Sequence, residues 1–288
     1  MSGLPRAVRV TAGNAGPFTG SGTNTYVLGS GEARVVIDPG PHDPAHMAAI
    51  VAAAGGHPIS YILVTHAHRD HVDGLAALKA ATGAATYGYG RAPRLPGAVH
   101  PASESPSGGD FVDDGLVLDH LLRDGDVVTA PGIALTAIHT PGHAPDHLCF
   151  ALGGSRILFS GDHVMGWSTS VIAPPEGHMG AYLASLEKLQ TLPASTYLPG
   201  HGEEIADGLR TVRAYLVHRQ MRERAVLDVI RAGGATVQSV TEAVYAGIAE
   251  NLANAARLSV IAHVELLAEK GLVTCDGALE KTTRIAAC

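Results

Sequence analysis

Three histidines and one aspartate crowd into the segment THAHRDH at residues 65–71, directly after the apolar run YILV at 61–64. A short apolar run rich in β-branched residues predicts a buried strand, and the apolar periodicity over 72–82 predicts a helix that follows the cluster. The polar side chains are therefore expected in the turn between a buried strand and a helix. A chain that contains such a turn is expected to be a layered α/β protein.

The rest of residues 1–208 repeats this alternation of short strands and helices. Further strands are predicted at 26–28, 33–37, 132–138, 147–152, 156–160 and 196–199, and further helices at 43–54 and 180–191. Because strands and helices interleave and the strands form two groups, we expect a sandwich of two similar α/β halves. A stretch at 91–109 that is rich in Pro, Ser and Gly is predicted to be a surface loop.

The pattern changes after Gly208. A long amphipathic helix at 209–232 is followed by a Gly-Gly turn, a helix capped by Thr236, a third helix at 254–270 and the hairpin signal GLVTCDG. Three helices followed by a hairpin are the outline of a winged helix. Because 288 residues exceed the usual size of a single core, we predict one domain over 1–208 and a small winged-helix-like domain over 209–288.

Composition excludes several classes of protein. With 46% hydrophobic and 16% charged residues the chain is globular rather than disordered. It has no apolar stretch of the length that a signal peptide or membrane helix needs, so a cytoplasmic location is predicted. Three scattered cysteines are too few for a disulfide framework or a Cys-x-x-Cys zinc site. The formal net charge of −7 disfavours long-range attraction to nucleic acid phosphates.

Histidine, with sixteen copies, is the unusual component of the sequence. Neutral imidazole nitrogens are good zinc ligands, so His66 and His68 can converge on one ion while Asp70 and His71 turn to another. Four ligands do not fill two tetrahedral shells, and more are expected at later strand ends. Three candidates each follow an apolar strand in a Gly-bearing turn: His143 in TPGH, Asp162 in SGD and His201 in LPGHG.

The motifs HAHRDH, TPGH, SGD and LPGHG, in this order and spacing, resemble those of the metallo-β-lactamase superfamily over roughly the first 205 residues. The resemblance implies a four-layer αββα sandwich. It also implies that His66, His68 and His143 bind one metal ion and that Asp70, His71 and His201 bind a second. Asp162 would then bridge both ions, and Asp38 in VIDPG would orient the metal-binding loop.

The N-terminal segment GPFTGSGTNTY, the segment SGDHVMGWST and the winged-helix-like tail narrow the resemblance. They resemble the branch of the superfamily that contains the endoribonuclease beta-lactamase-like protein 2. The resemblance implies two Zn²⁺ ions per chain, about 3.5–4 Å apart, that share a water and present hydroxide to a carbonyl or phosphoryl centre. The catalytic residues Asp70 and Asp162 would accept a hydrogen bond from that hydroxide. Iron or manganese are alternatives to zinc, since imidazole and carboxylate suit several first-row metals.

Three functions stay open at this point. The first is hydrolysis of a small ester, thioester or lactone, with weak β-lactamase activity at most, because true β-lactamases usually carry Cys or Ser where this chain has Asp162. The second is a metal-dependent endoribonuclease on single-stranded RNA, with arginines along its path. The third is a nucleic-acid-binding regulator whose sandwich senses metal. The arginines proposed for the RNA path are Arg69, Arg91, Arg94, Arg210, Arg213, Arg219, Arg222 and Arg224.

A small-molecule substrate and a homodimer are the expected partners, with RNA as the alternative substrate and no membrane. Asp146 and His147 closely follow His143, and we interpret them as a hydrogen-bonding pair behind the metal ligands. His163, beside Asp162, is either a further metal ligand or a residue that supports the ligands by hydrogen bonding. The loop MGWSTS at 165–170 holds the only tryptophan, which is either a wall for the substrate or a packed structural residue.

Overall fold

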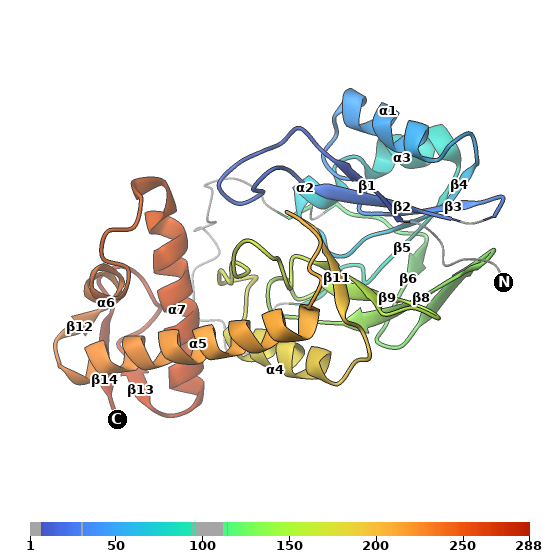
Figure 1. The fold of residues 1–288 in the computed structure, drawn as a ribbon. Helices are drawn as coiled ribbons and strands as arrows, with labels where there is room; N and C mark the ends of the chain where they lie inside the picture. The colour runs from blue at the N-terminus through green and yellow to red at the C-terminus, as the bar shows by residue number, and fades with distance from the viewer. Residues whose placement is uncertain (1–6, 30, 94, 96–111, 114) are drawn as a thin grey trace.

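The computed structural model describes residues 7–29, 31–93, 95, 112–113 and 115–288. Most of the predicted surface loop at 91–109, including Arg94, lies outside the described residues. Figure 1 shows two sheets packed face to face with helices on their outer faces, and a smaller helical unit at one end.

The first sheet begins antiparallel and continues parallel. Strands β1 to β3 pair antiparallel, whereas β3 to β6 pair parallel to one another. This arrangement places the carboxyl ends of β3, β4 and β5 at one edge, where loops can carry functional side chains. The strands in order are β1 (Ala7–Thr11), β2 (Asn24–Leu28), β3 (Arg34–Ile37), β4 (Ile59–Leu63), β5 (Ala85–Gly88) and β6 (His120–Leu121).

The second sheet has the order β11-β10-β9-β8-β7 and is antiparallel except for the parallel pair β10 and β11. Its central strands are apolar on both faces because one face packs on the first sheet and the other on helices. Leu148, Cys149 and Phe150 are all fully buried. The strands are β7 (Val127–Ala130), β8 (Ile133–His139), β9 (Leu148–Leu152), β10 (Ile157–Gly161) and β11 (Thr196–Pro199).

Separate apolar cores join the layers of the sandwich. Residues such as Leu63, Leu135 and Phe150 fill the space between the two sheets. Ile50 and Leu78 pack helices on the first sheet, and Tyr182 and Leu186 pack a helix on the second. The outer helices are α1 (Pro44–Ala53), α2 (Arg69–Val72), α3 (Leu75–Thr82) and α4 (Met179–Gln190). The predicted αββα sandwich is therefore confirmed.

The C-terminal unit contains three helices and a small antiparallel sheet of order β12-β14-β13, which confirms the winged-helix-like domain. Thr236 and Ser239 form a capping box that starts the second helix. The elements are α5 (Gly208–Arg231), β12 (Ala235–Thr236), α6 (Val237–Val244), the 3₁₀ turn η1 (Glu250–Leu252), α7 (Ala253–Glu269), β13 (Val273–Cys275) and β14 (Arg284–Ala287).

Helix α5 belongs to two cores. Its first half places Val212 and Tyr215 against α4, and its second half places Val226 and Ile230 in the core of the C-terminal unit. Figure 1 shows the helix running from beneath the sandwich into that unit. The division between residues 208 and 209 therefore stays a prediction, because the helix that follows it stabilises both sides.

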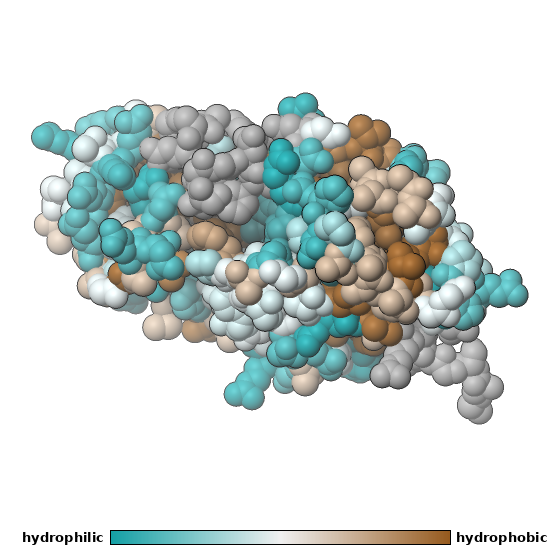
Figure 2. Space-filling model, turned by 90° about the horizontal axis from the view of Figure 1, so that it is seen from above, coloured by the Kyte–Doolittle hydropathy of each residue, from teal (hydrophilic) through white to brown (hydrophobic). Residues whose placement is uncertain are grey.

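The outer surface differs between the two ends of the molecule. In the view of Figure 2 the end formed by the C-terminal unit is mostly hydrophilic, whereas apolar residues gather over the sandwich, on the side where α1 lies. Helix α1 is rich in alanine and exposes Val51 at 49%. No helix in the described part of the chain is long and apolar enough to cross a membrane. The cytoplasmic location stays a prediction.

Candidate metal centre

Four loops at one edge of the two sheets supply the candidate ligands. The loop after β4 carries residues 66–71, the loop between β8 and β9 carries His143, and the turns after β10 and β11 carry Asp162 and His201. All seven side chains that the sequence predicted as ligands meet at this edge. They form three groups whose ligand atoms lie within 4.8 Å of one another: His66, His68 and His143; His66, His71 and Asp162; and Asp70, His71 and His201.

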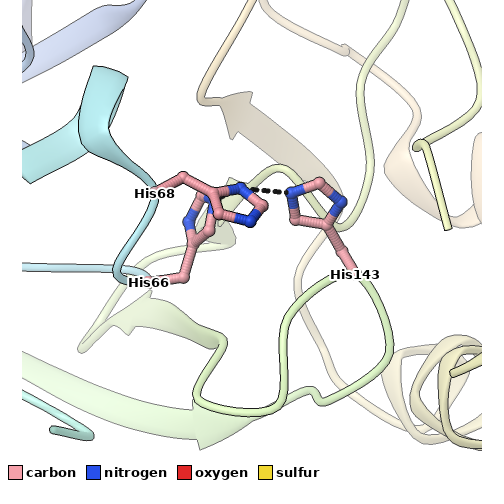
Figure 3. A group of neighbouring side chains, drawn as sticks. All are labelled: His66, His68 and His143. Carbon is pink, nitrogen blue, oxygen red and sulfur yellow. Dashed lines mark hydrogen bonds between the residues drawn. The ribbon is translucent and has the colours of Figure 1, made fainter. Parts of the chain in front are cut away.

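The first group consists of three imidazoles that point to one place (Figure 3). His66 Nε2 lies 2.8 Å from His68 Nδ1, and His143 Nε2 lies 3.0 Å from the same nitrogen. Neutral imidazoles that turn ring nitrogens toward one point present lone pairs to a cation there. This group coincides with the set expected to bind one metal ion.

The other two groups contain the carboxylates of Asp70 and Asp162. Asp70 Oδ2 lies 3.5 Å from His71 Nε2 and 3.2 Å from His201 Nε2. Asp162 reaches both groups, since its Oδ1 lies 3.4 Å from His71 Nε2 and its Oδ2 lies 3.7 Å from His143 Nε2. The carboxylate of Asp162 therefore occupies the position between the two groups that a bridging ligand needs.

A pair of divalent cations fits the chemistry of these donors. His71 Nε2 and Asp162 Oδ1 are buried side-chain atoms without a hydrogen-bond partner among the described residues. Burying polar atoms without partners is costly, and a cation between them would satisfy both. All the donors are nitrogen or oxygen, which suits zinc and also iron or manganese.

The pKa shifts of the histidines also favour the binding of cations at this site. Burial lowers the pKa of His68 to about 3 and holds the pKa of His66 well below its usual range, so both imidazoles are neutral and ready to bind metal. Burial also lowers the pKa of His201, but the carboxylates of Asp162 and Asp70 outweigh it and raise this pKa to about 9. The carboxylate side of the site therefore needs positive charge, as protons or as metal ions.

Four of the histidines are held by an oxygen on the ring nitrogen that faces away from the centre. His71 Nδ1 bonds Asp38 Oδ2 at 2.9 Å, and His143 Nδ1 donates to the carbonyl of Val171 at 2.6 Å. The corresponding contacts of His66 and His201 are to Thr65 Oγ1 at 3.0 Å and the Gly22 carbonyl at 3.2 Å. Such contacts fix the tautomer and the direction of a ligating imidazole.

Asp38 connects this support to the backbone of the metal-binding loop. Its Oδ1 accepts the N–H of Thr65 and its Oδ2 accepts the Thr65 hydroxyl, each at 2.8 Å. Its φ of 52° is in the left-handed region, which non-glycine residues seldom adopt. One buried carboxylate therefore orients both the loop and His71, as the resemblance implied.

Glycines let the ligand loops approach one another. A Cβ at Gly200 would lie 2.4 Å from Asp162 Oδ1 and 2.8 Å from His71 Cε1. A Cβ at Gly161, whose φ is 48°, would lie 2.6 Å from His147 Nε2. Gly161 precedes Asp162 and Gly200 precedes His201. A side chain at either glycine would collide with neighbouring atoms, so close contact as well as the turn requires glycine there.

The neighbouring polar residues support the site from behind. His147 Nε2 accepts the N–H of Asp162 at 3.2 Å, and Asp146 Oδ2 accepts the N–H of Ala67 at 2.9 Å. Both residues hold loop backbone, in agreement with the interpretation as supporting residues. His163 packs its ring against Tyr182 with centroids 4.7 Å apart, and neither of its ring nitrogens has a hydrogen-bond partner among the described residues.

Thr23, which the sequence did not identify as part of the site, donates its hydroxyl to Asp70 Oδ2 at 3.1 Å. Asn14 in turn bonds this hydroxyl at 2.9 Å. The only signal was the polar run GSGTNT at 20–25, which does not show which hydroxyl would reach the site. Of the seven ligand candidates, His68, Asp70 and His143 are partly exposed and the others are buried, so a substrate would approach from their side.

Fold and site together define an αββα sandwich with a cluster of candidate metal ligands at one edge. A family model described as the metallo-beta-lactamase superfamily matches residues 18–201, and one described as a beta-lactamase associated winged helix domain matches residues 236–281. The chain belongs to the metallo-beta-lactamase superfamily. The predicted family and the predicted enzyme class, a hydrolase, are thereby confirmed.

Named relatives share nearly the whole chain. The beta-lactamase-like protein 2 homolog of Caenorhabditis elegans is 33% identical over 276 residues, which cover 94% of this chain and 85% of the relative. An atrochrysone carboxyl ACP thioesterase of Aspergillus chevalieri is 33% identical over 263 residues, or 88% and 77% of the two chains. In fold, the chain is similar to a metallo-beta-lactamase family protein of Thermus thermophilus, with a TM-score of 0.77, 21% identity and coverage of 99% and 98%.

Proposed function

We propose that the protein is a dinuclear, zinc-dependent hydrolase of thioesters or related acyl esters. The observation that carries the proposal is the position of Asp162, whose Oδ1 is 3.4 Å from His71 Nε2 and whose Oδ2 is 3.3 Å from His201 Nε2 and 3.7 Å from His143 Nε2. One carboxylate between two sets of imidazoles is the arrangement that holds two cations close together. Similarity to a relative named as an acyl carrier protein thioesterase supports the acyl substrate.

The chain's own residues would carry out the reaction in the following way. His66, His68 and His143 would hold one cation, Asp70, His71 and His201 the other, and Asp162 both. When bound, two such cations would lower the pKa of a water to about 7 and polarise the acyl oxygen. Asp70, partly exposed at the edge of the site, would accept a hydrogen bond from that water and direct it toward the acyl carbon. Thr23 would keep the Asp70 carboxylate in this orientation.

The C-terminal unit does not favour the interpretation as a DNA-reading regulator. In a helix-turn-helix the second helix enters the major groove, and the corresponding helix here is α7. Most of α7 is buried, and Ala262 and Leu266 pack into the core under the second sheet. A helix that is covered in this way has no free face for a groove, so we propose that the unit supports the sandwich instead.

Thiol release from an acyl thioester such as S-octanoyl-N-acetylcysteamine tests the proposal. Protein reconstituted with zinc should hydrolyse the thioester and contain about two metal ions per chain by mass spectrometry. Asp162→Ala should lose the activity, and His57→Ala should retain it, because His57 is exposed and lies at the opposite end of β4 from the ligand loop. The same preparations loaded with iron or manganese would identify the metal that supports the fastest turnover.

An unstructured RNA belongs in the same assay, because the endoribonuclease branch was the alternative. Salt-sensitive cleavage of RNA by the wild type, with no thiol release, would overturn the acyl proposal. Thiol release that RNA does not inhibit would support it. The homodimer stays a prediction.

A further inference from the structure

A cavity of about 290 Å³ lies between the sandwich and the C-terminal unit. Four parts of the chain line it: Pro17 and Phe18 from the loop between β1 and β2, Met165 and residues 167–172 from the loop after β10, three residues of α5, and six residues between 245 and 259 around η1 and α7. Most of the lining is apolar, with Trp167, Ile172 and Ile248 among its side chains. A cavity of this size and character suits the body of a small organic ligand.

The charged side chains of the lining are all basic. Arg219 and Arg222 face the cavity with His218, and no Asp or Glu is among the described residues that line it. Neither arginine forms an ion pair with a carboxylate in the described part of the chain. Arg222 donates to the carbonyl of Val244 at 2.8 Å and lies 4.2 Å from the centroid of the Tyr245 ring, so most of its donors are left for a ligand.

Arg219 is a buried cation with incomplete hydrogen bonding. Its residue is only 3% exposed, it donates one Nη to the carbonyl of Ser170, and its Nε has no hydrogen-bond partner among the described residues. A buried guanidinium without a counter-charge is costly. A ligand carboxylate would supply that charge with two parallel hydrogen bonds.

One loop joins the wall of the cavity to the metal centre. Asp162 begins this loop, Val171 accepts the bond from His143, and Ser170 donates to the carbonyl of Asp162. The Trp167 ring lies against Gly202, which follows His201, because a Cβ there would be 2.5 Å from its Cδ1. A ligand in the cavity would therefore touch the same loop that carries the bridging carboxylate.

We propose that this cavity binds the far end of the acyl substrate, and that the acyl group combines an apolar chain with a terminal carboxylate held by Arg222 and Arg219. The inference rests on the proposed acyl hydrolysis. It assigns substrate specificity to residues of both domains, and it gives the C-terminal unit a role as one wall of the substrate site.

Trp167 is the only tryptophan of the chain and lines the cavity, so its fluorescence reports occupancy without any turnover. Three probes separate the contribution of the charge from that of the apolar chain: octanoate, its neutral counterpart octanamide, and acetate, which has the charge without the chain. We expect octanoate to shift the emission and to bind the zinc-loaded protein at least about ten-fold more tightly than either other probe, because octanamide lacks the charge that pairs with the arginines and acetate lacks the chain that fills the cavity.

Arg222→Met tests the assignment, since it keeps the length of the side chain and removes the charge. It should abolish the preference for octanoate over octanamide. Arg224→Met, on the same helix but outside the cavity, should leave the preference unchanged, since the Arg224 side chain is 84% exposed. Octanoate held by the metal ions alone would bind the Arg222→Met protein as tightly as the wild type, and this result would overturn the proposal.

Kinetics separate this proposal from the proposed function. A thioester with a terminal carboxylate, the monosuberoyl thioester, should have a KM about ten-fold higher in Arg222→Met than in the wild type with little change in kcat, while the octanoyl thioester should be unaffected. Octanoate binding without any thioester turnover would overturn the function and retain the cavity. Turnover of both thioesters with equal KM in both proteins would retain the function and overturn the cavity assignment.

Discussion

The metal centre and the cavity both contain buried charged or ionisable side chains, but they differ in the sign of that charge. Around the metal centre, Asp38, Asp70 and Asp162 supply negative charge, and the imidazoles turn lone pairs inward. In the cavity, Arg219 and Arg222 supply positive charge, and the described residues that line it include no carboxylate to pair with them. The first site thus calls for cations and the second for an anion.

Under the two proposals, the metal centre supplies the reactivity and the cavity supplies the recognition of the substrate. The metal centre is built from turns of the sandwich alone, and its ligands are held by contacts such as Asp38 to His71. The cavity needs the C-terminal unit, because α5 and α7 complete its wall. Variants in the first region should change turnover, and variants in the second should change affinity or stability.

Removing a metal ligand should have the largest effect. We expect His143→Ala or Asp70→Ala to lower thioester hydrolysis by on the order of 10³-fold or more, because the reaction loses a cation that stabilises charge in the transition state. Circular dichroism should show a retained fold. If either variant stays active and keeps its metal content, the replaced residue is not a metal ligand. The expectation that variants of the metal centre change turnover would then fail for that residue.

The sequence predicted His143, Asp162 and His201 because each sits beside a glycine in a turn after an apolar strand, and it predicted the other four ligands because they crowd into residues 66–71. It predicted the long helices and the central apolar strands from their hydrophobic periodicity, but it missed β1, β5, β6, β7 and β12. The helix expected over 72–82 is broken, and α3 begins only after Gly74. A Cβ at Gly74 would lie 2.7 Å from Met47 Cε and 3.1 Å from the Gly40 carbonyl, so the break is set by tertiary contact. No local pattern could show this, and the cavity likewise exists only where distant segments meet.

Asp38→Asn should have the next largest effect. The amide keeps the size of the side chain but weakens the bonds to Thr65 and His71, and such supporting contacts typically contribute 10-fold to 100-fold in metal affinity or activity. Competition with a chelator would measure the affinity of the variant. An effect on octanoate binding larger than the effect on metal affinity would contradict the separation of the two sites.

The stability of the C-terminal unit, which forms one wall of the cavity, should depend on pH through His263 in α7. Burial lowers its pKa to about 3, with the cations of Arg219 and Arg222 adding to the effect. Because the folded pKa lies below the unfolded value of 6.5, the unfolded chain takes up the proton first, and stability is lost as pH falls from about 6.5 toward 3. The loss amounts to about 2 kcal/mol at pH 5.

Replacing this histidine by leucine should remove that part of the acid sensitivity. The difference in unfolding free energy between His263→Leu and the wild type should shift by about 2 kcal/mol in favour of the variant from pH 7.5 to pH 5. Urea unfolding at the two pH values measures it. The difference isolates His263, because the metal ligands titrate equally in both proteins. A pH-independent difference would contradict the prediction.

The smallest effect is expected at the start of α6, far from the chemistry. The Thr236 hydroxyl accepts the N–H of Ser239 at 3.1 Å, and Ser239 returns a bond to the N–H of Thr236 at 2.9 Å. Thr236→Ala removes the cap and should lower the unfolding free energy by about 1 kcal/mol. Thr241→Ala, inside the same helix, is the matched control and should be neutral or slightly stabilising. If the C-terminal unit only walls the cavity, Thr236→Ala should leave kcat at 25 °C unchanged, and a large loss of kcat would show that the unit also acts on the reaction.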